Sequence, residues 1–233
     1  MILAAGRGER MRPLTDHTPK PLMMAGGEPL IGWHIRRLAA CGVTDLVINH
    51  AWLGERLETA IGAGEAYGVN IAWSREAEAL ETAGGIAQAL PLLGEGPFVV
   101  VSSDVLTDLD FAPLMRETAL LDGKKRMIHL ILVDNPPHHP GGDFVLCEDG
   151  RVSADPEAAG QRLTYAGIGG YHPALFAELA CQSPVRHPLR PLLVDAMARG
   201  QVTGEHFKGT WLDVGTAERL EEANRIARQW ESA

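Results

Sequence analysis

The sequence has few cysteines and no long apolar run. Its three cysteines, Cys41, Cys147 and Cys181, are far apart and form no CxxC pair, so neither a disulfide framework nor a zinc site is expected, and a reducing compartment is favoured. No apolar segment approaches the roughly 18 residues that a membrane-spanning helix needs. The opening MILAA is too short for a secretory signal and lacks the basic lead-in. These absences predict a cytoplasmic protein that does not enter a membrane.

The chain also lacks an excess of positive charge. Its 21 Lys and Arg are outnumbered by 30 Asp and Glu, giving a formal net charge of −9, whereas binding to nucleic acid or to an anionic membrane needs a basic surface. Any anionic ligand must therefore be met by local positive charge. Repeats, low-complexity tracts and linkers are absent too, and 45% hydrophobic residues are ordinary for a globular chain. The 233 residues thus predict one folded domain, spanning 1–233.

Strand-like and helix-like segments alternate through the first half of the chain. The expected strands are 1–5, 44–50, 69–74 and 97–104, and the expected helices are 29–42, 53–64 and 82–93. This alternation predicts βαβ units and a mostly parallel sheet. From about residue 127 the pattern loosens into strands at 127–133, 143–148 and 163–171, and it closes with a helix at 215–230. We expect this second half to be arranged around the sheet.

A glycine-containing basic loop follows the first expected strand. It therefore lies at the carboxyl edge of the sheet, where open α/β folds bind ligands. Gly6 and Gly8 let the backbone N–H groups approach a bulky anion, and Arg10 and Lys20 can make charge-assisted contacts with phosphate. No Walker GxxxxGK(S/T) motif occurs, and Met11 stands where the dinucleotide motif GxGxxG needs its third glycine. These residues alone leave a phosphate-binding loop and a basic surface loop equally open.

Residues 3–22 resemble the LAAGxGTRLxPLT…PKP motif of the sugar nucleotidyltransferases, enzymes that join a nucleoside triphosphate to a sugar 1-phosphate. They read LAAGRGERMRPLT and later TPKPL, with Glu9 and Met11 at positions where the family usually has Thr and Leu. The segments LETAGGIAQAL, VVVSSD, TYAGIGGY and WLDVGT are similar to the family's base-recognition, metal-binding, sugar-binding and second metal-binding segments. The resemblance covers residues 1–220. It implies a Rossmann-like three-layer α/β/α sandwich with a mostly parallel central sheet, of the GT-A-like kind.

The resemblance also implies roles for individual residues, with a nucleotide-binding half at about 1–110 and a sugar-binding half at about 111–233. The implied nucleotide-binding residues are Ala5, Gly6, Gly8, Glu9, Arg10, Lys20, Thr82, Gly85 and Ser102. The implied substrate-binding residues are Gly142, Tyr165 and Gly167. Asp104 and Asp213 are the implied ligands of a Mg²⁺ cofactor, and Arg10, Lys20 and Asp104 are the implied catalytic residues. The pair Gly84 and Gly85 has an alternative interpretation, close packing of its helix.

The chemistry of nucleotidyl transfer agrees with the residues present. Two highly charged anions must be brought together, so charge neutralisation and positioning are the main tasks. A phosphate monoester has its second pKa near 6, so the attacking phosphate needs no general base, and the sequence has no obvious catalytic His or Cys. Arg10 is expected on the β- and γ-phosphates and Lys20 on the α-phosphate and the sugar phosphate. Mg²⁺ fits because it binds one or two carboxylates together with substrate phosphates.

Several loops, among them VINHAWLGE, LVDNPPHH and GEHFKGTWLDVGT, are similar to those of bacterial family members that use UTP and N-acetylmuramate 1-phosphate in peptidoglycan recycling. Ser102-Ser103 stands where these members have Asn-Gly, and Tyr165 where many relatives have Asn. Two alternatives stay open. One is another substrate pair, such as mannose 1-phosphate with GTP or glucose 1-phosphate with UTP or dTTP. The other is a non-catalytic subunit that senses nucleotide sugars, although a sensor needs no pair of metal carboxylates.

The remaining polar residues carry weaker expectations. His138 and His139 are adjacent and cannot easily share one ion, so no metal role is expected for them. If the sugar carries a lactyl carboxylate, His139, Arg162 and Lys208 are its equally ranked partners. Asp108 and Asp110 are expected to cap a helix beginning near residue 111, and Arg7 and Arg12 to lie on the surface. Without a long C-terminal extension such as a left-handed β-helix, a monomer is expected.

Overall fold

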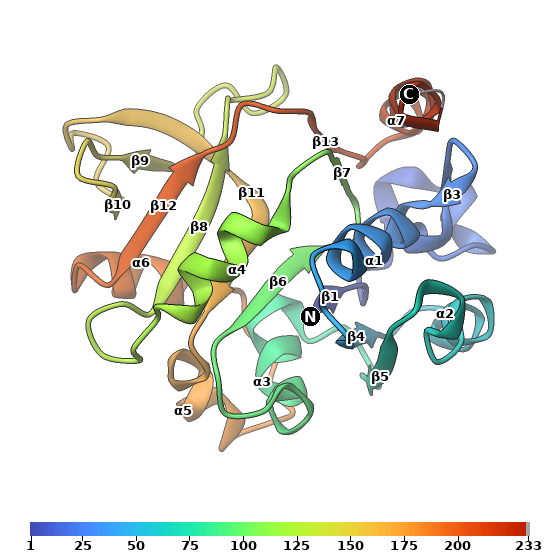
Figure 1. Ribbon diagram of the computed structural model, residues 1–233, viewed down its shortest axis with the longest axis horizontal. Coiled ribbons are helices and arrows are strands. Elements are labelled where there is room, and N and C mark those ends of the chain that lie inside the picture. Colours follow the sequence, from blue (N-terminus) through green and yellow to red (C-terminus); the bar gives the residue numbers. More distant parts are fainter. Residues whose placement is uncertain (232–233) are drawn as a thin grey trace.

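The computed structural model describes residues 1–231 (Figure 1). Its main sheet comprises β1 (Ile2–Leu3), β4 (Asp45–His50), β5 (Asn70–Arg75), β6 (Phe98–Ser102), β8 (Ile128–Val133), β9 (Phe144–Leu146), β10 (Val152–Ser153), β11 (Gln161–Tyr171) and β12 (Val202–His206). Within the described residues these form one nine-stranded sheet in the order β10-β9-β11-β6-β1-β4-β5, with β8 beside β11 and β12 beside β8.

The first half of the chain supplies the parallel part of this sheet. Strands β6, β1, β4 and β5 pair in parallel, as the alternation of strands and helices predicts. The second half is not arranged around the sheet but belongs to it, because β11 pairs antiparallel with β6, β8 and β9. Strand β6 is apolar and covered on both faces, so its outer hydrogen-bonding edge also needs a partner. Strand β11 provides that partner.

Helices cover both faces of the sheet. On β6, Phe98 and Val100 face a core that includes side chains of α3 (Glu81–Leu93) and α6 (Arg190–Ala198). Val99 and Val101 face a second core, built with α1 (Leu30–Ala40), α2 (Gly54–Ile61) and α4 (Phe111–Ala119). The short α5 (Ala177–Ala180) packs against α3, and α1 and α4 lie in front of the sheet in Figure 1. The expected three-layer α/β/α sandwich is confirmed.

Strands β10 and β12 of the main sheet were not expected from the sequence, and neither were four short strands outside that sheet. They are β2 (Met24–Ala25), β3 (Glu28–Pro29), β7 (Val105–Thr107) and β13 (Trp211–Asp213). Strands β2 and β3 form a small hairpin, and β7 pairs with β13. The last helix, α7 (Ala217–Glu231), packs against the basic loop and the segment that follows it, because its Ala223 and Ala227 share an apolar core with Met11 and Met23. The chain therefore returns at its end to the region where it began.

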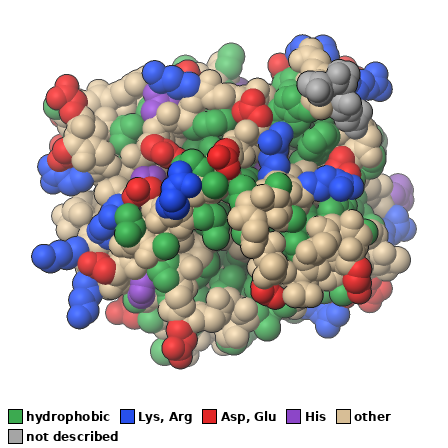
Figure 2. Space-filling view, viewed as in Figure 1, with side chains coloured by type: hydrophobic (Ala, Val, Ile, Leu, Met, Phe, Trp, Pro, Cys, Tyr) green, Lys and Arg blue, Asp and Glu red, His purple; other side chains and the backbone are tan. Residues whose placement is uncertain are grey.

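Charge is mixed over the surface drawn in Figure 2, where Lys and Arg side chains alternate with Asp and Glu. Across residues 1–231, no helix has both the length and the apolar character that crossing a membrane requires.

Candidate active site

Neighbouring parallel strands end together at one edge of the sheet. The register pairs Leu3 of β1 with Asn49 of β4 and with Ser102 of β6, so the segments that follow β1 and β6 emerge side by side. Between them lies a first cavity of about 560 Å³. Its wall contains most of the residues that the sequence predicts for the nucleotide, namely Ala5, Gly6, Gly8, Glu9, Arg10, Lys20, Thr82 and Ser102, together with Asp104.

The loop after β1 turns sharply at Gly8. Its backbone is left-handed, with φ 69° and ψ 39°, and a Cβ there would lie 3.0 Å from Thr15 Cγ2 and 3.2 Å from Lys20 Cβ. Backbone and space therefore both require glycine. The Thr15 hydroxyl donates to the Gly8 carbonyl oxygen at 2.9 Å. The basic loop is thus folded against the cavity.

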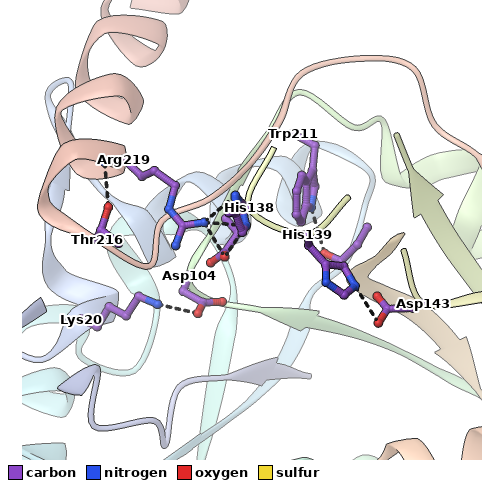
Figure 3. A network of polar contacts seen from close by, with 10 residues as sticks. Lys20, Asp104, His138, His139, Asp143, Trp211, Thr216 and Arg219 are labelled. Atoms are coloured by element: carbon purple, nitrogen blue, oxygen red, sulfur yellow. Dashed lines mark hydrogen bonds and ion pairs between the residues drawn. The ribbon is translucent and has the colours of Figure 1, made fainter. Parts of the chain in front are cut away.

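Two cations of the basic loop line the cavity, and they differ in whether they are paired with a carboxylate. Lys20 is buried, and its Nζ donates to Asp104 Oδ2 at 2.6 Å (Figure 3). Arg10 lines the same cavity but forms no ion pair with any residue in 1–230, the range whose side chains the structure describes. Arginine is always charged and presents a planar set of donors that matches phosphate. Arg10 is therefore available to an anionic ligand, whereas Lys20 is already bound to a carboxylate.

The neighbouring arginines pair outside the cavity. Arg7 lies 3.7 Å from Asp16 Oδ1 and stacks 3.9 Å above the Trp52 ring. The Nε of Arg12 donates to the same Asp16 oxygen at 2.8 Å. Neither arginine is part of the cavity wall, in agreement with the expected surface location.

The pairing of β13 with β7 brings Asp213 next to Asp104. Asp213 lies opposite Val105 in this antiparallel ladder, and the N–H of Val214 donates to the Asp104 carbonyl oxygen at 2.8 Å. Asp213 Oδ2 accepts a hydrogen bond from Arg219 Nη1 at 3.0 Å. The two predicted metal carboxylates, distant in sequence, are thus neighbours in the fold.

A buried histidine supports the strand next to Asp104. His34 of α1 is 1% exposed, and its Nε2 lies 2.7 Å from the carbonyl oxygen of Val105. Burial lowers the pKa of His34 to about 4, so at neutral pH the imidazole is uncharged and its Nε2–H donates to that carbonyl. The contact holds β7 and gives His34 a structural role.

The carboxylates of Asp104 and Asp213 form a donor set suited to a hard divalent cation. Both line a second cavity, of about 450 Å³, and both side chains are partly exposed, 36% and 23%. Two carboxylate groups with room for phosphate oxygens are a usual arrangement for Mg²⁺. Among residues 1–230 no cluster of three or more His, Cys, Asp or Glu side chains could hold an ion by itself. The donor set therefore fits an ion that completes its coordination with substrate.

The second cavity adjoins the first. Arg10, Ser102 and Asp104 line both, while Tyr165 and Gly167 line only the second. A Cβ at Gly167, where φ is 74°, would lie 3.0 Å from Ser102 Oγ, at a point where β11 bulges. The junction of the two cavities is therefore lined by Arg10 and Asp104, with Lys20 in the wall of the first cavity and Asp213 in the wall of the second.

Two of the predicted sugar-binding residues contribute little polar surface to this cavity. The Tyr165 hydroxyl pairs with the Tyr171 hydroxyl at 2.8 Å, and burial raises the pKa of Tyr165 to about 12, so its phenol belongs to the core. Gly142 does not line the cavity. A Cβ there would lie 2.6 Å from Asn135 Oδ1, and its N–H donates to the His139 carbonyl oxygen at 3.2 Å. Close packing accounts for this glycine.

At the α3 end of the first cavity, Thr82 lines the wall but Gly85 does not. A Cβ at Gly84 would clash with the Val185 carbonyl oxygen, and one at Gly85 would lie 2.6 Å from Glu76 Oε1. The packing alternative therefore accounts for both glycines. Arg186, which also lines the cavity, was not singled out in the sequence because its loop carries no motif.

Several polar residues have partners that only the fold reveals. Asp110 caps α4 as expected, accepting from the Ala112 N–H at 2.9 Å. The expected cap at Asp108 is wrong, because its Oδ1 accepts from the Thr210 N–H at 2.8 Å and holds the segment before β13. The structure also reveals Arg219, whose position in an amphipathic helix gives no functional signal.

His138 and His139, both labelled in Figure 3, lie in one loop and line the second cavity. His138 Nε2 lies 2.7 Å from Arg219 Nη1 and 3.5 Å from Asp213 Oδ2. His139 Nε2 lies 3.2 Å from Asp143 Oδ1, and the other Asp143 oxygen accepts from the Tyr165 N–H at 3.0 Å. Asp143 therefore ties the histidine loop to β11.

Known proteins are similar to this chain over nearly its full length. The chain is 54% identical over 231 residues to an N-acetylmuramate alpha-1-phosphate uridylyltransferase of Neisseria meningitidis, covering 99% of this chain and 98% of that protein. A protein of the same name from Caulobacter vibrioides is 35% identical, with 92% and 90% covered.

The fold has a solved counterpart. A crystal structure from Bacillus anthracis, provisionally assigned as a glucose-1-phosphate thymidylyltransferase, superposes with a TM-score of 0.81 at 24% identity, covering 97% of this chain and 94% of that one. The nucleotidyl transferase family profile matches residues 1–229. The chain therefore belongs to the nucleotidyl transferase family.

Proposed function

We propose that the protein transfers the uridylyl group of UTP to N-acetylmuramate 1-phosphate, producing UDP-N-acetylmuramate and pyrophosphate. The observation that carries the proposal is the junction of the two cavities, which Arg10 and Asp104 line, with Lys20 bound to Asp104 in the first cavity and Asp213 in the wall of the second. Membership of the family makes the chain a nucleotidyltransferase. The choice of substrates follows the names of its Neisseria and Caulobacter relatives.

In the proposed reaction an oxygen of the sugar phosphate attacks the α-phosphorus of UTP. The bond from that phosphorus to the bridging oxygen breaks, and pyrophosphate leaves with the electron pair. The attacking phosphate is largely dianionic at neutral pH because its second pKa is near 6, so no side chain must remove a proton. The protein's task is to position the two anions and to neutralise their charge.

The cations and carboxylates divide this task. Asp104 and Asp213 would hold Mg²⁺, which when bound neutralises phosphate charge and fixes the phosphate oxygens. Arg10, which has no carboxylate partner among residues 1–230, binds the β- and γ-phosphates and then the leaving pyrophosphate. Lys20 leaves Asp104 to contact the α-phosphate and the sugar phosphate. Gly6 and Gly8 direct backbone N–H groups toward the triphosphate.

The sugar end of the proposal rests on the second cavity. Of the three expected partners of a lactyl carboxylate, His139 lines this cavity. Arg162 donates instead to the Gly141 carbonyl oxygen, and Lys208 lines a third cavity that adjoins the second at His138. This arrangement favours His139.

We further propose that residues 1–233 act as one domain, with nucleotide-binding and sugar-binding halves that divide near residue 110. The first cavity is lined mainly by residues before that point and the second mainly by residues after it. The proposal includes a cytoplasmic location and a role in peptidoglycan recycling.

The deciding experiment measures pyrophosphate release over a matrix of nucleoside triphosphates and sugar 1-phosphates with Mg²⁺. Preferential turnover of UTP with N-acetylmuramate 1-phosphate supports the proposal. Turnover restricted to another pair, such as GTP with mannose 1-phosphate, replaces its substrates. Asp104→Asn should abolish turnover, and an unchanged rate would disprove the metal role of this carboxylate.

A further inference from the structure

A buried polar pair connects the two ends of the first cavity. The side chain of Asn49, at the end of β4, faces Glu76 in the loop before α3, with Nδ2 donating to Glu76 Oε1 at 2.6 Å. Asn49 is 2% exposed and Glu76 is 6% exposed. A carboxylate is seldom buried so deeply unless hydrogen bonds satisfy it. Burying this pair therefore costs free energy, which its hydrogen bonds must offset.

Each member of the pair also holds a backbone N–H. Asn49 Oδ1 accepts from the Ala4 N–H at 3.0 Å, and Glu76 Oε2 accepts from the Leu80 N–H at 2.9 Å. Ala4 precedes the glycine loop and Leu80 precedes Glu81 and Thr82, so the segments at both ends of the cavity are fixed by one chain of hydrogen bonds. We call this chain of hydrogen bonds the Asn49–Glu76 relay.

The orientation of the relay follows from its donors. The Ala4 N–H can only donate, so the Asn49 atom that faces it is the carbonyl oxygen, and the amide nitrogen must face Glu76. Glu76 then receives two donors, one on each oxygen, an arrangement that suits a carboxylate. The relay also explains Gly85, where a Cβ would lie 2.6 Å from Glu76 Oε1 and 2.7 Å from Asn49 Nδ2.

We infer that Glu76 is a positioning residue for the nucleotide, acting through Asn49 and Leu80 to set the distance between the phosphate loop and the segment at the start of α3. The identity of the nucleotide rests on the proposed function, but the relay does not. Glu76 does not line the first or the second cavity, so its effect on binding must be indirect. The second cavity contains none of the relay residues.

The relay predicts an unusual pattern of variants. In Glu76→Gln one oxygen is replaced by an NH₂ group, which must face a donor, so one hydrogen bond is lost although the shape is kept. In Asn49→Asp two carboxylate oxygens meet at the 2.6 Å contact. In the double variant N49D/E76Q every partner is restored. The new carboxylate at position 49 accepts from the Ala4 N–H and from the new amide at position 76, while the oxygen of that amide accepts from the Leu80 N–H.

The test measures KM for UTP and for the sugar 1-phosphate, kcat, and UTP binding by calorimetry in the presence of Mg²⁺. We expect each single variant to raise the KM and Kd for UTP about tenfold, with the KM for the sugar phosphate changed less than about twofold. The double variant should return the UTP values to within about threefold of wild type. Glu205→Gln is the matched control, since it removes a half-buried carboxylate from β12, outside both cavities.

Three outcomes would overturn the inference. They are single variants that lower Tm without raising the Kd for UTP, equal losses for both substrates, and a double variant that regains Tm but not UTP binding. If the single variants fail to fold, recovery of folded, nucleotide-binding protein in N49D/E76Q still supports the relay, and its failure overturns it. A wild-type protein that binds UTP without turnover refutes the proposed function and leaves the binding test intact.

Discussion

The ion pair between Lys20 and Asp104 leads to a prediction about metal binding. The lysine Nζ lies 2.6 Å from a carboxylate oxygen that is proposed to hold Mg²⁺, so ammonium and metal compete for the same group. Lys20→Met removes the charge and keeps an apolar chain of similar size in a site that is only 8% exposed. We therefore expect K20M to lose turnover and yet to bind a divalent cation more tightly than wild type when no nucleotide is present.

The expected increase in metal affinity follows from the burial of the Lys20 and Asp104 side chains. Hydrogen bonds to charged groups contribute about 1.5–3 kcal/mol when protected, and exposed ion pairs about 0–1 kcal/mol. The Lys20 side chain is 10% exposed but that of Asp104 is 36% exposed. The pair therefore lies between the protected and the exposed case, and its contribution is about 1 kcal/mol. A cation that no longer displaces Lys20 should then bind about fivefold more tightly.

Mn²⁺ titration followed by electron paramagnetic resonance would measure this change. Arg10→Met is the matched control, because it removes one positive charge from the same cavity without breaking an ion pair among residues 1–230. Its Mn²⁺ affinity should rise less than that of K20M. Equal affinities for K20M and R10M, or weaker binding by K20M than by wild type, would refute the competition between Lys20 and the metal.

Three further changes test other parts of the structure. Asp213→Asn should lower kcat roughly a hundredfold or more with little change in Tm, because Asn can still accept from Arg219; near-normal turnover would contradict the metal role. Glu58→Gln should lower the free energy of unfolding, measured by urea denaturation, by about 1 kcal/mol at pH 7. Arg75 lowers the pKa of Glu58 from 4.5 to about 2, so the stability that this carboxylate contributes is complete above pH 4.5 and disappears as the pH falls toward 2. If E58Q were as much less stable than wild type at pH 2 as it is at pH 7, the ion pair would not be the origin of the effect. Tyr171→Phe should lower Tm by about 3 °C, measured by calorimetry, because it leaves the buried Tyr165 hydroxyl unpaired; an unchanged Tm would show that this bond contributes nothing.

The longer elements could be predicted because their periodicity is local. The helix expected at 29–42 is found at Leu30–Ala40, and the strand expected at 97–104 at Phe98–Ser102. Strands β7 and β13 have three residues each, too few for a period to be recognised. Their pairing is nevertheless the contact that joins Asp213 to Asp104.

The individual site residues likewise fall into those that the local sequence predicts and those that only the fold reveals. Gly8 and Lys20 follow from a short motif, since a glycine turn and a proline-flanked lysine are defined by their immediate neighbours. Arg219 and Glu76 belong to segments whose sequence is that of an ordinary helix and an ordinary loop. Their partners lie on other elements, so no local sequence pattern predicts their roles.

By itself, therefore, the sequence determined the alternation of strands and helices, the cation-bearing loop at the end of β1 and the family to which these motifs point. The tertiary structure alone decided which charges meet. It paired Lys20 with Asp104, brought Asp213 beside them and linked Asn49 to Glu76. The reason is physical: hydrophobic periodicity is a property of neighbouring residues, whereas strand register and helix packing depend on the whole core.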